Sequence, residues 1–121
     1  MQTAQLCAEV ADAKKAFNIV ILDLRKLTYI TDYFVICSGS STTQVSAIAD
    51  EVDQVLARSG IHPSHVEGQS DATWVLMDYG DVVVHIFDEQ TRAFYSLEKL
   101  WSESTRVPLA VCSAEIKNAV S

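Results

Sequence analysis

Two features of the sequence have the residue types of a nucleotidyltransferase site. The turn Ser38-Gly39-Ser40-Ser41 lies between an apolar run and a helical segment, and Glu51 and Asp53 have the spacing of a metal-binding carboxylate pair. In a helix, however, residues two apart point about 200° away from each other and cannot hold one Mg²⁺ ion together. A phosphate at the helix N-terminus remains conceivable, but the turn lacks the lysine of a P-loop, and helix capping explains its hydroxyls.

Histidine and cysteine side chains offer a second kind of chemistry, metal binding or nucleophilic catalysis. His62 and His65 are separated by two residues, but no second close pair completes a zinc-binding pattern. Cys37 and His85 have the types of a nucleophile and its base, yet both fall inside apolar runs, where an inert thiol and a hydrogen-bonded histidine are commoner. We therefore expect no metal, no cofactor and no catalytic residue.

The composition favours a protein partner over nucleic acid. The 121 residues, 49% of them hydrophobic, suffice for one domain with a core. Nine Lys and Arg against sixteen Asp and Glu give a net charge of −7, which works against a surface that must neutralise many phosphates. We expect a basic protein partner, no membrane association and no direct sequence-specific nucleic-acid binding. Three cysteines without a close pair, and no signal region or long apolar stretch, favour a cytoplasmic location.

Apolar periodicity predicts helices and strands in alternation. The expected elements are a helix carrying Leu6, Val10, Ala13 and Phe17, strands at 18–24 and 32–39, a helix ending at Gly60, a short strand after Pro63, a hairpin around Tyr79-Gly80, and a helix at 89–101 carrying Phe94, Leu97 and Trp101. This order predicts a single α/β domain over residues 1–101, with a mixed sheet of about five strands flanked by helices. Residues 102–121 are expected to be a tail that is either loosely held or a short helix.

The hairpin at residues 74–87 is unusual because both of its faces are largely apolar. Along its first strand, Trp74, Leu76 and Asp78 share one side, and Val75, Met77 and Tyr79 share the other. Each face needs a cover, and the domain's own helices can supply it. A partner is the other possible cover, because large apolar side chains beside acidic Asp78 and Asp81 have the composition of an interface with a basic protein.

Residues 19–101 resemble the Iojap family of ribosomal silencing factors. Four motifs in the same order carry the resemblance: IVILDLRKLTYITDYFVICSGSSTTQVSAIADEVDQVL, VEG, WVLMDYGDVVVHIF and RAFYSLEKLW. The resemblance implies a nucleotidyltransferase-like α/β fold without transferase activity, and homodimers away from the ribosome. It further implies binding to large-subunit ribosomal protein fourteen, at the face where the small subunit would join. Translation would then be blocked by steric exclusion, typically when nutrients are short.

The family pattern also suggests which residues contact the partner. Its recurring positions are Asp32, Trp74, Asp78, Gly80, Asp81 and His85. The predicted contact residues are Trp74, Met77 and Tyr79 as apolar anchors, Asp78 and Asp81 facing basic groups, and His85. Gly80 is assigned to the turn, and Asp32 to capping or orienting the loop before it. A nucleotide-binding or nucleotidyltransferase-type enzyme that uses the serine-rich turn remains the alternative function.

Overall fold

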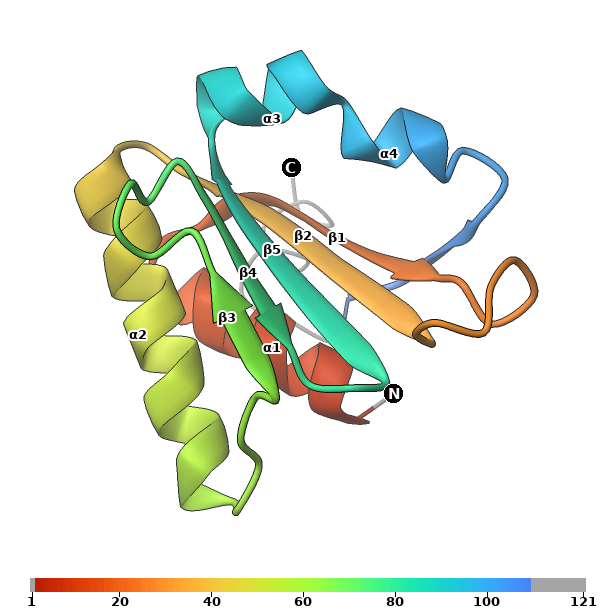
Figure 1. Ribbon diagram of the computed structural model, residues 1–121, viewed down its shortest axis with the longest axis horizontal. Helices are drawn as coiled ribbons and strands as arrows, with labels where there is room; N and C mark the ends of the chain where they lie inside the picture. The colour runs from red at the N-terminus through yellow and green to blue at the C-terminus, as the bar shows by residue number, and fades with distance from the viewer. Residues whose placement is uncertain (1, 110–121) are drawn as a thin grey trace, which may run out of the picture.

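The computed structural model describes residues 2–109, which form a single α/β domain of three layers (Figure 1). A mixed sheet lies in the middle, helices α1 and α2 cover one face, and the short helices α3 and α4 lie across the other. The elements are α1 (Gln2–Ala13), β1 (Phe17–Asp23), β2 (Tyr33–Gly39), α2 (Thr42–Arg58), β3 (His65–Glu67), β4 (Trp74–Asp78), β5 (Val82–Asp88), α3 (Glu89–Tyr95), α4 (Leu97–Leu100) and β6 (Thr105–Val107). The predicted fold class is confirmed.

The sheet has the strand order β3-β4-β5-β2-β1-β6. β2 and β5 pair in parallel, with Ile36 opposite His85, and the other neighbouring strands are antiparallel. The predicted hairpin is present as β4 and β5. The sequence predicts about five strands, but β6 is a sixth, formed by part of the expected tail. It pairs with β1, with Val107 opposite Ile21, and its three residues are too few to show an alternating pattern in the sequence.

Alternation along the central strands divides the core into two clusters. The larger cluster packs the inner face of the sheet against α1 and α2, and it contains Val75, Met77 and Cys37. The smaller cluster lies on the α3 and α4 face and is built around Ile36 and Phe87. The inner face is therefore covered by two long helices, whereas the outer face has only two short ones.

Helix α2 is capped at its start by a serine hydroxyl and is followed by Gly60, as the sequence predicts. Ser41 is its N-cap, and its hydroxyl accepts a hydrogen bond from the backbone N–H of Gln44 at 3.1 Å. The Gln44 side chain in turn accepts from the backbone N–H of Ser40 at 2.6 Å. Ser59 is the C-cap, and Gly60 follows it with a φ of +76°, a value that favours glycine.

Two helix boundaries differ from the prediction. The sequence predicts one helix over residues 89–101, but Ser96 adopts a left-handed conformation with φ +48° and separates α3 from α4. The first helix is predicted to include Phe17, but α1 ends at Ala13 and the chain turns through Lys15, whose φ is +66°. Apolar spacing alone does not reveal either break, because the side chains beyond it continue the same pattern. Among the described residues, no helix has the length and apolarity needed to cross a membrane.

Gly68 allows β4 to lie close to the segment that follows β3. A Cβ atom at Gly68 would lie 1.9 Å from the carbonyl oxygen of Trp74, and the φ of Gly68 is +85°. Gly80 also has a positive φ, +92°, but a Cβ there would meet no atom within 4 Å. Alanine substitutions at the two glycines therefore distinguish the cost of a steric clash together with backbone strain, at Gly68, from the cost of backbone strain alone, at Gly80.

We predict that Gly68→Ala lowers the free energy of unfolding by about 3 kcal/mol or more, because the added methyl displaces the Trp74 backbone. Gly80→Ala should cost about 1 kcal/mol, from strain alone. Urea denaturation followed by circular dichroism measures both values. Equal losses in the two variants would contradict the close approach at Gly68.

Candidate partner-binding surface

The hairpin places the predicted contact residues on two opposite faces of the sheet and at its turn. Trp74, Asp78 and His85 belong to the outer face, and Met77 to the inner face. Met77 is only 2% exposed and packs in the larger core cluster, so it has no surface to offer a partner. The alternation of β4 directs its side chain toward the α1 and α2 layer, and we do not retain it as a contact residue.

Tyr79 also packs against the inner core, although the residue as a whole is half-buried. Its hydroxyl is buried and has no hydrogen-bond partner among the described residues. Its backbone N–H donates to the carbonyl oxygen of Val82 at 2.8 Å, which closes the turn between β4 and β5. Tyr79 is therefore placed to anchor the turn onto the core rather than to contact a partner.

Trp74 lies on the outer face among other aromatic rings. Its indole stacks on Phe87, with ring centroids 4.9 Å apart and an interplanar angle of 26°. The ring of Tyr95, from α3, lies at the same centroid distance on a tilted plane. The indole is half-buried, so part of it remains accessible.

Helix α3 extends this aromatic surface outward. Phe94 is 80% exposed and Tyr95 is 51% exposed, and their rings contact edge to face at 5.1 Å. We call Trp74, Phe94 and Tyr95 the aromatic patch. The sequence predicts Phe94 on the covered side of a longer helix, but the break at Ser96 ends α3 with this side chain in solvent. A signal was available: adjacent helical residues point about 100° apart, so Phe94 and Tyr95 cannot both face the sheet.

Other large apolar side chains are also exposed. Leu100 lies on α4, and Leu27, Tyr29 and Ile30 lie in the loop between β1 and β2. Three of these side chains have no ring, and within residues 2–109 the ring of Tyr29 contacts no member of the aromatic patch, so exposure alone does not define the patch.

The acidic residues of the hairpin have different structural roles. Asp78 shapes the turn, because its side-chain Oδ1 accepts a hydrogen bond from the Gly80 N–H at 2.8 Å. Asp81 is exposed, and its backbone oxygen accepts from the N–H of Asp32, another exposed aspartate. Asp78 lies four residues from Trp74 along β4, about 14 Å at the usual rise of a strand. The acidic end of the hairpin and the aromatic patch thus lie at opposite ends of β4.

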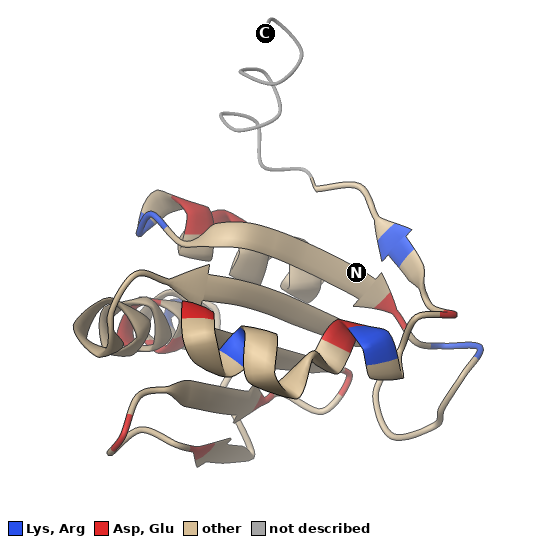
Figure 2. Cartoon of the chain, turned by 90° about the horizontal axis from the view of Figure 1, so that it is seen from above, with Lys and Arg blue, Asp and Glu red and all other residues tan. Residues whose placement is uncertain are grey.

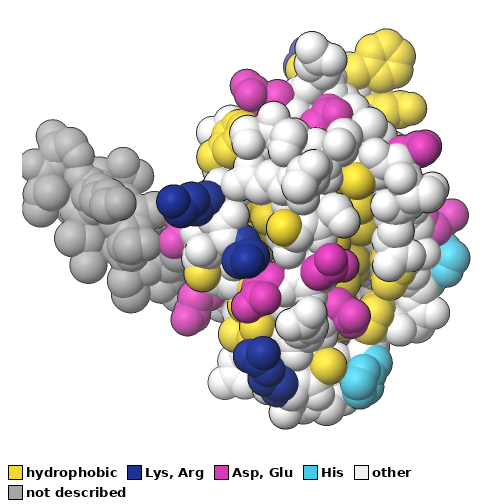
Figure 3. Space-filling model, turned by 90° about the vertical axis from the view of Figure 1, so that its left-hand side faces the viewer, with side chains coloured by type: hydrophobic (Ala, Val, Ile, Leu, Met, Phe, Trp, Pro, Cys, Tyr) yellow, Lys and Arg dark blue, Asp and Glu magenta, His cyan; other side chains and the backbone are white. Residues whose placement is uncertain are grey.

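Lysine and arginine residues are dispersed among acidic ones in the part of the chain that the structure describes (Figure 2). Figure 3 shows acidic side chains beside a few basic ones and small apolar areas on the side that lies at the left of Figure 1. This distribution agrees with the net charge of −7 and favours a basic partner.

His85 is buried on the outer face beneath the aromatic rings. It is 3% exposed, and its Nδ1 accepts a hydrogen bond from the indole Nε1–H of Trp74 at 3.0 Å. Its ring meets Phe34 edge to face, at a centroid distance of 4.5 Å. Burial lowers the pKa of His85 to about 4, so the imidazole is neutral near pH 7. Cys37 packs in the opposite, inner cluster, so the two side chains cannot form a catalytic dyad.

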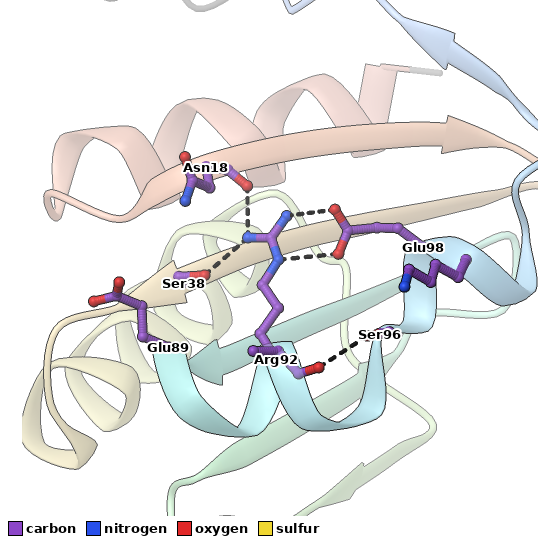
Figure 4. A pocket seen from close by; sticks show the side chains of 8 residues that line it. Asn18, Ser38, Glu89, Arg92, Ser96 and Glu98 are labelled. Atoms are coloured by element: carbon purple, nitrogen blue, oxygen red, sulfur yellow. Dashed lines mark hydrogen bonds and ion pairs between the residues drawn. The ribbon is translucent and has the colours of Figure 1, made fainter.

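Arg92 fastens the α3–α4 segment to the sheet (Figure 4). Its guanidinium forms two hydrogen bonds with the Glu98 carboxylate, at 3.1 and 3.0 Å. The remaining nitrogen donates to the backbone oxygen of Asn18 at 2.7 Å and to the hydroxyl of Ser38 at 2.8 Å. The hydrogen bonds from Arg92 hold the pKa of Glu98 below its usual value. A hollow of about 390 Å³ beside this cluster is lined by Arg92, whose guanidinium is already hydrogen-bonded within the protein.

The serine-rich turn shows no catalytic arrangement. Ser38 bonds Arg92, while Ser40 and Ser41 both bond Gln44, so hydroxyls of the turn serve the helix cap and the α3 attachment. Glu51 and Asp53 lie on α2, as the sequence predicts. Within residues 2–109 there is no group of three His, Cys, Asp or Glu side chains that could hold a metal ion.

A family model described as "Ribosomal silencing factor during starvation" matches residues 1–120. The chain belongs to this family. It is 46% identical, over 87% of its length and 90% of the relative's, to a protein from Halalkalibacterium halodurans named ribosomal silencing factor RsfS. A protein of the same name from Bacillus subtilis is 43% identical over 88% of this chain and 87% of its own.

A solved structure agrees with the family assignment. The crystal structure of a protein from Chromobacterium violaceum superposes with a TM-score of 0.82 at 34% identity and covers 93% of both chains. The names of the relatives describe regulation of the ribosome and no enzymatic reaction. The predicted resemblance is thereby confirmed.

We predict that Arg92→Lys lowers the free energy of unfolding by about 2 kcal/mol, because lysine cannot reproduce the bidentate pair together with the bonds to Asn18 and Ser38. Arg25→Lys is the matched control. Arg25 also bonds a carboxylate twice, that of Asp23, but its side chain is 58% exposed, against 11% for Arg92. The control should change stability by less than about 0.5 kcal/mol. Chemical denaturation measures both, and similar losses would contradict a structural role specific to Arg92.

Proposed function

We propose that this protein silences translation by binding the large ribosomal subunit through ribosomal protein fourteen and blocking the joining of the small subunit. Membership of the silencing-factor family supports the ribosomal target. The observation that carries the choice of surface is the aromatic patch: two exposed rings and a half-buried indole in contact with one another. Aromatic side chains at the centre of an interface typically contribute much of its binding free energy.

The aromatic patch packs on the sheet and on a helix that is hydrogen-bonded to it, an arrangement that suits a docking surface. Trp74 stacks on buried Phe87, and α3 is fastened to the sheet by Arg92. Side chains held in this way lose little conformational entropy on binding. A domain of this size can cover about 800 Å² of its partner, the usual scale of a specific interface, and its bulk then excludes the small subunit.

Electrostatics support a basic ribosomal protein as the contacted component. The net charge of −7 accelerates encounter with a basic protein and disfavours stray contacts with ribosomal RNA. Exposed Asp81 and Asp32, at the far end of the hairpin, are placed to face basic groups at the edge of the contact. Asp78 contributes charge there, although its carboxylate also holds the turn.

The proposed mechanism needs no catalysis, metal or cofactor, and it places the protein in the compartment that holds ribosomes, the cytoplasm in a bacterium. The domain proposed to act comprises residues 1–101, and β6, from the segment proposed as a tail, adds one strand to its sheet. Homodimers away from the ribosome are part of the proposal as well, with the exposed aromatic patch as the surface that both partners would use.

We predict that Phe94→Ser weakens binding to isolated ribosomal protein fourteen at least tenfold, because it removes an exposed ring that the fold does not need. Asp81→Lys should weaken binding severalfold at low salt and less at high salt, since the charge acts over a screened distance. Isothermal titration calorimetry measures both affinities. Gln54→Ala is the control, because Gln54 is exposed on α2, on the opposite face of the sheet from the aromatic patch.

The proposed surface is contradicted if Gln54→Ala weakens binding as much as Phe94→Ser does. The proposed partner is contradicted if the unaltered chain does not bind ribosomal protein fourteen. Binding of a nucleotide with Mg²⁺ that is lost in Ser40→Ala would instead favour the enzyme alternative.

A further inference from the structure

The hydrogen bond between Trp74 and His85 fixes the proton positions on the imidazole. An indole N–H can only donate, so the Nδ1 atom of His85, 3.0 Å away, must be the acceptor and carry no proton. In the neutral imidazole the proton then lies on Nε2. That Nε2–H is buried and has no hydrogen-bond partner among the described residues.

This arrangement is unfavourable for stability alone. A buried donor without an acceptor loses its hydration and gains nothing in return. His85 is surrounded by the rings of Phe34, Trp74 and Phe87, and a phenylalanine at this position would pack among them without the buried Nε2–H. The indole N–H of Trp74 would lose its acceptor, but Trp74 is only half-buried, so that N–H can turn toward water. The position of His85 therefore calls for an explanation other than core packing.

The orientation of the Trp74 indole supplies that explanation. Stacking on Phe87 fixes the plane of the indole, but a half-turn about χ2 keeps the ring close to that plane and exchanges its two edges. A single hydrogen bond from Nε1 to a buried acceptor removes this freedom, because it selects the edge of the indole that points inward. The orientation chosen in this way also determines how the indole lies beside the ring of Tyr95, whose centroid is 4.9 Å away.

We propose that His85 is a positioning residue for docking: its Nδ1 lone pair holds the Trp74 indole in the orientation that the partner recognises. This inference rests on the proposed function, since it concerns the same aromatic patch. His85 itself makes no contact with the partner, because it is buried beneath Trp74 and Phe34. The predicted contact at this position is thus replaced by an indirect role.

Two substitutions distinguish the effect of losing the hydrogen-bond acceptor from the effect of changing the shape of the side chain. His85→Phe keeps a ring and removes the acceptor, whereas His85→Asn places an amide oxygen where Nδ1 stood. We expect His85→Phe to weaken binding to purified large ribosomal subunits at least tenfold, while its midpoint of thermal unfolding stays equal or rises. His85→Asn should bind within threefold of the unaltered chain, even if it unfolds at a lower temperature.

The orientation of Trp74 is read independently in a ¹⁵N–¹H spectrum. The chain has two tryptophans, and Trp101→Phe assigns the two indole N–H signals. The Trp74 signal should shift and exchange faster with water in His85→Phe, and stay close to its original position in His85→Asn. A chain with Trp74 replaced by benzothienylalanine, prepared with Trp101→Phe, removes only the N–H and should lose binding to the same extent. It serves as the second variant if His85→Phe does not fold.

The proposal is overturned if the Trp74 signal is unchanged in His85→Phe, or if that variant binds large subunits within twofold of the unaltered chain after its signal has moved. It is also overturned if His85→Asn keeps the signal and loses binding. Failure of the proposed function looks different: the unaltered chain itself does not bind large subunits, while the spectra still decide whether His85 orients Trp74.

Discussion

The structure depends on a central sheet whose two apolar faces receive unequal cover. On the inner face, α1 and α2 bury the side chains of β4 and β5 completely, Met77 among them. On the outer face, only the seven residues of α3 and the four of α4 lie over the strands. The cost of exposing apolar surface to water makes the uncovered remainder unfavourable in the free protein. Half-buried Trp74 belongs to that remainder. The other two rings of the aromatic patch, Phe94 and Tyr95, lie on α3, which Arg92 holds over the sheet in a geometry that leaves both rings in solvent.

Most of the fold could be predicted from the sequence because its strands and long helices carry strong periodic patterns. Runs of β-branched residues predict β1, β2 and β5. The apolar stripe that follows the capping serines predicts α2. The break at Ser96 could not be predicted, since it depends on a left-handed residue and on long-range bonds from Arg92 to Asn18 and Ser38. Strand β6 was missed for a related reason: three residues acquire strand structure only by pairing with β1.

The candidate site was harder to predict than the fold. The composition of the hairpin pointed to it as a candidate surface, and Trp74 does lie on the outer face. Alternation alone, however, could not say which face the two long helices would cover and which would have only the two short ones. Met77 and Tyr79 consequently entered the predicted contacts although they pack against the inner core, while exposed Phe94 was placed on the apolar face of a helix over residues 89–101. The role of His85 could be inferred only from the tertiary structure, because its hydrogen-bond partner Trp74 is eleven residues away on the adjacent strand. A motif shared with a family identifies such residues, but it does not say whether their side chains contact the partner or only orient another side chain that does.

The central claim is that one protein domain, without chemistry, prevents two ribosomal subunits from joining. Light scattering during the mixing of purified small and large subunits measures it most directly, with the protein added to the large subunits beforehand. The account predicts that the amplitude of joining falls as the protein approaches one copy per large subunit, and that adding nucleotide does not alter the inhibition. Joining of unchanged amplitude and rate, with large subunits saturated by the protein, would contradict it.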